Sequence, residues 1–373
     1  MKLKEIYLSG YKSYGQINEP IQFEDINIII GANGAGKSNF ISFLEMIAFI
    51  AKDDFSDYVA GNGYATSLVH ARRERIDHIK GRLVFADDQN RDEYSITIKQ
   101  GVDGGLFISN ETVVYQASDY SRPYQHQYES SGKRTALIEA AETDHTARIM
   151  LNILKGCRIY HFNDTSINSK MRMPGYIEDD RFLKPDAGNL AAFLYRIKNH
   201  PETIKLYQRI IYMVREVFPR FDRFELHPRV NERGGENVSL NWKEKGCDDV
   251  FGPHMLSDGT LRFIALCALL LGPKDSRSEV IILDEPELGL HPHAVRVLAQ
   301  IIKMVAGEVQ VIIATQSREL LNEFEAKDII VAEFDPEKET SILKRLDESV
   351  LEEWLAEYSI GELWDKNIIG GTP

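Results

Sequence analysis

The chain has 373 residues, of which 43% are hydrophobic and 27% charged, a composition typical of a soluble globular protein. No apolar run approaches the roughly 18 residues of a membrane-spanning helix, so no membrane partner is expected. The net charge of −13 argues against a protein whose whole surface binds nucleic acid. Three scattered cysteines and a start without a signal peptide favour a cytoplasmic protein and exclude a disulfide framework.

The first third of the chain predicts strands around one Gly-rich loop. Alternating apolar residues predict a strand over 3–8, and the apolar run 26–30 predicts a strand buried on both faces. The segment 31–38 follows at once, and apolar residues at helical spacing over 40–47 predict a helix after it. Further strands separated by Asp, Asn and Gly turns predict an antiparallel meander at 81–87, 94–99 and 105–115.

The middle of the chain predicts a helical lobe. Helical patterning covers 135–155 and 188–218, and 158–162 predicts a strand between them. Residues 230–254 predict loops around a short strand at 237–242. No sustained heptads occur between the Gly-rich loop and residue 256, so no long coiled coil is expected.

The final third alternates between strands and helices. Strands are predicted at 280–283, 311–314 and 329–331, with helices at 261–271 and 292–306. Such alternation predicts a parallel sheet and an α/β fold. We therefore expect three parts, with 1–157 and 256–373 forming one head and 158–255 forming the lobe and loops.

The Gly-rich loop fits the pattern G-x-x-x-x-G-K-[ST] in full, and its context of strand, loop and helix is that of a P-loop. Such a loop turns backbone N–H groups toward phosphate oxygens, and the helix start adds its positive end. Lys37 is predicted to reach the β- and γ-phosphates, and the Ser38 hydroxyl to bind Mg²⁺. The predicted nucleotide-binding residues are Gly31, Ala32, Asn33, Gly34, Ala35, Gly36, Lys37 and Ser38.

Two acids end the apolar strand at 280–283. The carboxyl end of a parallel strand is where ligands bind, so Asp284 is predicted to hold the metal and Glu285 to act on the attacking water. Surface acids at a strand end are the simpler alternative, which the neighbouring P-loop disfavours.

Ser257, Asp258, Gly259 and Thr260 precede the apolar helix at 261–271. Ser257 suits an N-cap, and Gly259 exposes backbone N–H groups at the positive end of a helix. By itself this segment is better explained as an ordinary helix cap. Its place between the P-loop and the acid pair favours an anion-binding role.

These motifs, in this order, resemble ABC-type ATPases of the RecF/SMC/Rad50/OLD branch. Gly10–Tyr14 is similar to the aromatic-Lys-Ser-aromatic stretch of that branch, and Asp284–Pro292 is similar to the D-E-P-E-x-x-L-H-P pattern of the AAA_21 group. The resemblance covers almost the whole chain and implies an ABC-ATPase head with a parallel P-loop core, an antiparallel β subdomain and an inserted helical lobe.

The resemblance also implies that ATP is sandwiched between two copies of the chain, so that Ser257 to Thr260 act on the partner's nucleotide. Leu288, Gly289 and His291 would form the D-loop at that interface. Gln316 stands where many relatives carry a switch His, and it can bond water or phosphate but cannot become a cation, which predicts slow turnover. Asn163 and Asp164 occupy the Q-loop position without its usual Gln; they also fit a polar strand end.

The remaining features allow two interpretations each. The basic residues Arg72, Arg73, Arg75, Lys80 and Arg82, and the looser group Lys170, Arg172, Arg181 and Lys184, are either DNA contacts or ordinary solvated surface. The C-terminal Trp354, Tyr358 and Trp364 either dock a partner or pack on the head of their own chain.

The leading hypothesis is a cytoplasmic, ATP- and Mg²⁺-dependent ATPase that couples dimerisation to DNA or to a partner, as relatives in DNA repair or phage defence do. OLD-type relatives carry a nuclease domain after the head, but the residues after Asp335 are too few for one, so a nuclease or toxin-like effector is expected as a separate chain. A membrane-transporter subunit and a nucleotide-gated scaffold with little hydrolysis are the alternatives.

Overall fold

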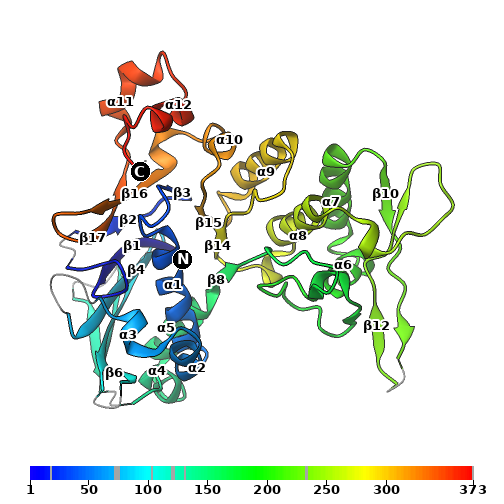
Figure 1. Cartoon of the computed structure of the whole chain (residues 1–373). Coiled ribbons are helices and arrows are strands. Elements are labelled where there is room, and N and C mark those ends of the chain that lie inside the picture. The colour runs from blue at the N-terminus through cyan, green and yellow to red at the C-terminus, as the bar shows by residue number, and fades with distance from the viewer. Residues whose placement is uncertain are drawn as a thin grey trace.

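The computed structural model describes residues 1–16, 19–70, 76–101, 104–118, 122–129, 132–231 and 234–371. Two six-stranded sheets, one mainly parallel and one antiparallel, lie side by side, and a helical lobe extends from the mainly parallel sheet (Figure 1). The predicted α/β class is confirmed. Among the described residues the longest helix has 15 residues, so the prediction of no long coiled coil also agrees with this part of the chain.

The first sheet is the parallel core, with strand order β17-β16-β3-β15-β14-β8. All neighbouring strands are parallel except β17, which pairs with β16 antiparallel. The strands are β3 (Ile26–Ile30), β8 (Cys157–Tyr160), β14 (Val280–Asp284), β15 (Gln310–Ala314), β16 (Ile329–Asp335) and β17 (Thr340–Arg345).

The second sheet is the predicted antiparallel meander, extended at both ends, with order β2-β1-β4-β5-β6-β7. Each strand is antiparallel to its neighbours. The strands are β1 (Lys2–Ser9), β2 (Ile21–Gln22), β4 (His78–Ala86), β5 (Asn90–Gln100), β6 (Leu106–Ala117) and β7 (Tyr124–Tyr128).

Each face of the parallel sheet packs into its own hydrophobic core. Ile28 and Ile30 of β3 pack in the core shared with the helical lobe, whereas Ile29 packs in the core shared with the antiparallel sheet. In β14, Leu283 and Ile282 divide in the same way. Because successive side chains of a strand point to opposite faces, these strands must be apolar throughout, which explains their unbroken apolar runs.

Helices cover both faces of the parallel sheet. On the face toward the antiparallel sheet, the shared core is built with α1 (Lys37–Ala51), α2 (Phe55–Gly61), α3 (Tyr64–Leu68), α4 (Ala136–Ala140) and α5 (His145–Gly156). The opposite core is built with α6 (Leu190–Asn199), α7 (Ile204–Val217), α8 (Asp258–Leu271) and α9 (Pro292–Val305), and Figure 1 shows α6 and α7 at the far end from the antiparallel sheet.

Small sheets extend the helical lobe. One pairs β10 (Phe221–Phe224) with β13 (Trp242–Glu244), and the other has the order β11-β12-β9. The latter strands are β9 (Gly175–Tyr176), β11 (Arg229–Val230) and β12 (Glu236–Val238). The single strand predicted at 237–242 was therefore wrong: its two ends belong to different sheets.

The two long helices predicted in the middle of the chain are each interrupted. Residues 135–155 form α4 and α5, because Asp144 leaves helical geometry and caps α5, its Oδ1 accepting from Thr146 N at 2.8 Å. Residues 188–218 form α6 and α7, with a turn over 200–203. The proposed boundary at 157/158 would also cut β8 from the sheet in which it pairs with β14, so a boundary after residue 160 fits the strand order better.

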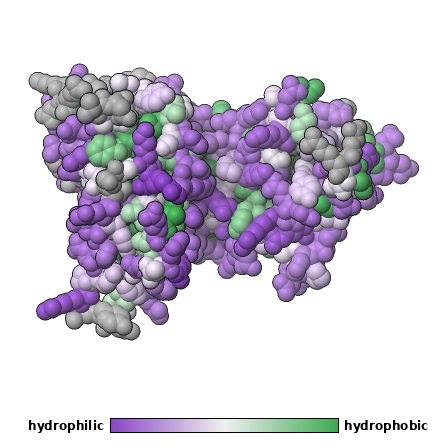
Figure 2. Space-filling view, turned by 90° about the horizontal axis from the view of Figure 1, so that it is seen from below, coloured by the Kyte–Doolittle hydropathy of each residue, from purple (hydrophilic) through white to green (hydrophobic). Residues whose placement is uncertain are grey.

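The C-terminal segment forms α10 (Arg318–Leu321), α11 (Glu348–Leu355) and α12 (Ile360–Asp365). Ile360 and Leu363 are buried in the core of their own head, as the simpler interpretation predicted. Trp354 stays 45% exposed beside Tyr358. The face seen in Figure 2 is covered mainly by hydrophilic side chains. In the described part of the chain, no helix combines the length and the apolar character needed to cross a bilayer.

Asp92 in β5 gives a stability prediction. It is 2% exposed, and burial, together with nearby Asp87, raises its pKa to about 6. Because this folded-state pKa lies above the unfolded value near 4, the ionised carboxylate destabilises the fold as pH rises through this interval. We expect Asp92→Asn to stabilise the protein by roughly 1–3 kcal/mol at pH 8 and by little below about pH 4.

Thermal unfolding at both pH values measures the effect. Asp88→Asn is the matched control, because Asp88 is an exposed carboxylate in the turn before β5. Equal changes for both variants, or a larger gain for Asp92→Asn at pH 4 than at pH 8, would contradict the assignment.

Candidate functional site

The loop between β3 and α1 has the backbone geometry of a phosphate-binding cradle. Gly31 has φ +151°, and a Cβ there would lie 2.4 Å from Ala332 O. Gly36 caps α1 with φ +115°, and a Cβ there would lie 2.5 Å from Ser341 Oγ. Only glycine fits at these two positions. Asn33, Gly34 and Ser38 remain exposed on the open side of the loop.

Lys37 lies inside this loop. Its Nζ donates to Gly31 O and, at 3.1 Å, to Ala32 O. Burial lowers the pKa of the ammonium, and the charges of Glu285 and Asp284 partly oppose that effect. The predicted cation of the P-loop and the predicted acids of β14 therefore lie close enough to interact electrostatically.

The acid pair lies at the carboxyl end of β14. Burial raises the pKa of Asp284, Glu285 raises it further, and His161 and Lys37 oppose the rise. Glu285 has φ +46°, an uncommon conformation for a non-glycine residue, and its N–H donates to Ala314 O at 2.8 Å. The neighbouring strand β15 thus fixes the direction of Glu285.

Gln316 meets Glu285 directly. Its Nε2 donates to Glu285 Oε1 at 2.8 Å, so the predicted switch residue and the predicted base form one hydrogen-bonded pair. Both line a cavity of about 400 Å³ that continues to Leu288 and Gly289. The sequence placed these residues in separate motifs, and the fold brings them together.

The donor set also fits Mg²⁺. The Ser38 hydroxyl and the Asp284 carboxylate are oxygen ligands of the kind that this ion prefers. Among the described residues, no group of three or more His, Cys, Asp or Glu side chains could hold a metal ion by itself. Mg²⁺ would therefore take its remaining ligands from phosphate oxygens and water, as it commonly does.

Glu287 supports the switch segment and was not predicted as a site residue. Its Oε1 accepts from the Thr315 hydroxyl, and Thr315 Oγ1 in turn accepts from Ser317 N at 2.9 Å. Burial raises the pKa of Glu287. The chain from Glu287 to Ser317 therefore fixes the backbone that presents Gln316. The second Glu of the D-E-P-E motif marks Glu287 in the sequence, but the motif alone does not show that Thr315 is its partner.

The signature segment and the D-loop are packed against each other within one chain. Ser257 caps α8, with its Oγ accepting from Thr260 N at 3.2 Å. A Cβ on Gly259 would lie 2.2 Å from Gly289 O, so glycine is required for this approach. Leu288 is 42% exposed beside this contact, and His291 caps α9.

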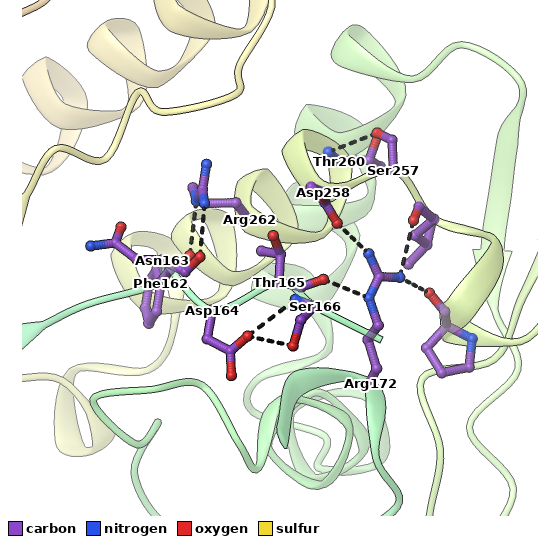
Figure 3. A network of polar contacts seen from close by, with 12 residues as sticks. Phe162, Asn163, Asp164, Thr165, Ser166, Arg172, Ser257, Asp258, Thr260 and Arg262 are labelled. Carbon is purple, nitrogen blue, oxygen red and sulfur yellow. Dashed lines mark hydrogen bonds and ion pairs between the residues drawn. The ribbon is translucent and has the colours of Figure 1, made fainter. Parts of the chain in front are cut away.

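Two arginines tie the signature segment to the chain that follows β8 (Figure 3). Arg172 donates from Nε to Thr165 O at 2.9 Å, from Nη1 to Leu256 O at 3.0 Å, and from Nη2 to Asp258 Oδ1 at 2.7 Å. Arg262, one turn into α8, donates from Nε to Phe162 O at 2.8 Å. Both arginines are buried.

The predicted Q-loop residues lie between these two arginines. Asn163 O accepts from Arg262 Nη2 at 3.3 Å, and the Asp164 carboxylate accepts from Ser166 N and Oγ at 3.1 and 2.7 Å. Asp164 is thus used in a local turn (Figure 3). His161, which directly precedes Phe162, lies near the acid pair, with its Nδ1 4.0 Å from Asp284 Oδ2, and the sequence motifs do not indicate a role for it.

A protein family described as "AAA ATPase domain" matches residues 1–211, more than half of the chain. The chain belongs to this family. A second family, described as "AAA domain, putative AbiEii toxin, Type IV TA system", matches residues 156–322. No curated protein matches the chain in sequence.

Solved structures of SMC heads share this ATPase's fold. The Smc head bound to the C-winged helix domain of ScpA is 18% identical, with a TM-score of 0.61 over 93% of this chain and 99% of that one. The Smc head with an extended coiled coil, bound to the C-terminal domain of ScpA from Pyrococcus furiosus, is 16% identical, with a TM-score of 0.58 over 95% and 98%. The SMC head domain from Thermotoga maritima is 14% identical, with a TM-score of 0.50 over 93% and 100%.

The family matches and the shared fold confirm the predicted resemblance to RecF/SMC-type, ABC-type ATPases. Within one chain the site residues form two groups. Lys37, Asp284, Glu285 and Gln316 converge at one edge of the parallel sheet, and Ser257 to Thr260 lie at the start of α8, where Gly259 packs against Gly289 of the D-loop. In the described residues, no hydrogen bond or ion pair joins the signature segment to the P-loop.

Proposed function

We propose that this chain binds and hydrolyses ATP with Mg²⁺ at a composite site, in which the P-loop of one copy faces the signature segment of a second copy. The observation that carries the proposal is the separation of the two groups within one chain. Ser257 and Gly259 present a capped helix start, which suits an anion, yet Gly259 lies against Gly289 of its own D-loop. Among the described residues, no hydrogen bond or ion pair joins either residue to the P-loop of the same chain.

The same contacts support coupling between the nucleotide and the shape of the lobe. Arg262 and Arg172 connect the segment 162–165, which follows the core strand β8, to both ends of the signature segment. A change at the core edge would therefore move the signature segment with it. We infer that ATP closes the dimer and hydrolysis opens it.

We further propose that this cycle acts on DNA or on a separate effector protein in the cytoplasm, in DNA repair or phage defence. The toxin–antitoxin wording of one matched family and the ScpA-bound SMC heads support a partner protein. Local ion pairs weaken the case for DNA contacts at the second basic group: Lys170 pairs with Asp186, Lys184 with Asp179, and Arg172 with Asp258.

In the first basic group, Arg82 lies near Glu5 and Glu93, and Lys80 is exposed. The other three members, Arg72, Arg73 and Arg75, lie outside the described residues. DNA binding would therefore have to be measured directly, with the salt dependence that phosphate contacts produce.

A complementation experiment tests the shared site. Lys37→Ala removes the cation of the P-loop, and Ser257→Arg blocks the signature segment; each variant alone should lose at least about 100-fold of the ATPase rate. In a mixture, half of the mixed dimers' sites combine an intact P-loop from one chain with an intact signature from the other. We expect the mixture to regain a measurable fraction of the wild-type rate.

The control is each variant mixed with itself at the same total concentration. An inactive mixture of chains that each remain folded would count against a shared site, and full activity of Ser257→Arg alone would remove the signature segment from the chemistry. If Lys37→Ala bound ATP as tightly as the wild type, the P-loop assignment itself would be wrong.

A further inference from the structure

The strand β7 forms an edge of the antiparallel sheet without the usual protection. It pairs with β6 on one side, and no described strand lies on its other side. Proteins commonly guard such edges with charges, proline, bulges or very short strands. The five residues of β7 include neither proline nor a charged Asp, Glu, Lys or Arg, and four of them are exposed. β7 is therefore open to pairing with another strand.

Among the described strands, the three other edges of the two sheets carry such protection, one of them β8, which has four residues and includes Arg158. At the opposite end of the same sheet, β2 has only two residues. In the parallel sheet, β17 ends with Lys344 and Arg345. In contrast, the exposed edge of β7 carries no Asp, Glu, Lys, Arg or Pro and is open to a partner strand.

The sequence of β7 identifies a partner, because Tyr124-Gln125-His126-Gln127-Tyr128 reads the same in both directions. An antiparallel copy of this strand, centred on His126, places every residue opposite one of its own kind. Tyr124 would face Tyr128 of the second copy, and Gln125 would face Gln127. Such a contact has two-fold symmetry, which is the commonest symmetry of protein dimers.

Both faces of β7 suit this pairing. Tyr124, His126 and Tyr128 form a row on one face, with ring centroids 6.4 and 4.4 Å apart. Across the pair, this row would continue as aromatic cross-strand contacts. Gln125 and Gln127 lie on the other face, where amide groups opposite one another can exchange hydrogen bonds.

We propose that β7 pairs antiparallel with β7 of a second copy, in register at His126, and so joins two antiparallel sheets into one. This contact is separate from the ATP site. Gly36 of the P-loop lies against Ser341 of β17 and Tyr14, whereas β7 is divided from β1 by β4, β5 and β6. The contact therefore leaves the P-loop free and links ATP-dependent dimers into larger assemblies.

A five-residue strand pair buries less than the roughly 1,200–2,000 Å² of a stable specific interface, so covalent trapping is the appropriate test. Directly opposed residues of antiparallel strands have Cα atoms about 4.5–5.5 Å apart, within disulfide range. In a full-length Cys247→Ser background, which removes the least buried thiol, His126→Cys should form a disulfide-linked dimer under mild oxidation. ATP should not be required.

The register supplies the controls. Gln125→Cys alone and Gln127→Cys alone place like thiols on the diagonal, about 7–8 Å apart, beyond the usual disulfide limit. Each should stay monomeric on a non-reducing gel, whereas their mixture should cross-link. Cross-linking of all three single variants to the same extent, or of none, would overturn the proposal.

A second measurement does not depend on cysteine chemistry. Gln125→Lys combined with Gln127→Lys puts like charges opposite each other and should abolish concentration-dependent association measured by light scattering without nucleotide. Gln125→Lys combined with Gln127→Glu puts opposite charges across the same pair and should retain that association. Equal behaviour of these two charge variants would also overturn the proposal, whatever the fate of the composite ATP site.

Discussion

Replacing Glu285 with Gln is expected to slow ATP hydrolysis by about 100- to 10,000-fold, the range that a general base contributes, while ATP binding persists. Glu285 lies at the end of β14, and its direction is fixed by Ala314 and Gln316. Gln keeps the size of the side chain but cannot take a proton from water. The P-loop and Asp284 are unchanged, so nucleotide affinity should change little.

The same variant should accumulate as an ATP-bound dimer. If hydrolysis opens the composite site, a chain that binds ATP without cleaving it remains closed. Light scattering should then report an ATP- and Mg²⁺-dependent doubling of the mass for Glu285→Gln, and a smaller ATP-dependent increase for the wild type.

Glu319→Gln is the matched control. Glu319 is an exposed carboxylate lining the same cavity, and its nearest partner is the Ser317 hydroxyl at 3.2 Å. It should retain a rate within a few-fold of the wild type. Equal phosphate release by Glu285→Gln and the wild type would remove Glu285 from the role of base. A monomeric Glu285→Gln protein saturated with ATP would contradict the sandwich.

The slow turnover predicted from Gln316 stays a prediction, and the structure shows the hydrogen bond on which it depends. A switch His could carry a positive charge, whereas Gln316 offers Glu285 a neutral amide hydrogen bond. The neutral donor does not stabilise the carboxylate as an imidazolium would.

The core of the site was predictable because its signals are local. The P-loop is eight consecutive residues, and the acid pair follows an apolar run that only a buried parallel strand explains. The edge at which both meet follows from strand direction alone. The sequence therefore anticipated the proximity of Lys37, Asp284 and Glu285.

The support of the site was not predictable, because it depends on contacts between distant segments. Arg172 belonged to a scattered basic group that looked like surface, yet it is buried against Leu256 and Asp258, more than 80 positions away. Arg262 sits in an apolar helix with no pattern that indicates its partner. The break between α4 and α5 differs, because its signal is local: Asp144 caps α5 through Thr146 N, and it also accepts from the Tyr128 hydroxyl at 2.6 Å.

Arg172→Ala is expected to uncouple ATP binding from dimerisation. The substitution removes the donors to Thr165, Leu256 and Asp258 together, so the signature segment loses its connection to the segment after β8. Hydrogen bonds from charged groups each contribute about 1.5–3 kcal/mol, and the loss should lower the free energy of unfolding by roughly 2–4 kcal/mol. The P-loop lies outside this network, so ATP affinity should stay within about three-fold, a change of less than 1 kcal/mol.

The informative measurement is the ATP-dependent dimer fraction in the Glu285→Gln background, at a temperature where both proteins are fully folded. We expect at least a ten-fold weaker dimer with Arg172→Ala, and partial recovery with Arg172→Lys, which restores one donor but not the planar fork. Lys170→Ala is the control, because Lys170 is an exposed neighbour that pairs with Asp186. A stable Arg172→Ala protein that dimerises with ATP as well as the control would show that Arg172 serves the fold alone. If the dimer is lost while ATP affinity is retained, the buried side chain of Arg172 couples nucleotide binding to the signature segment.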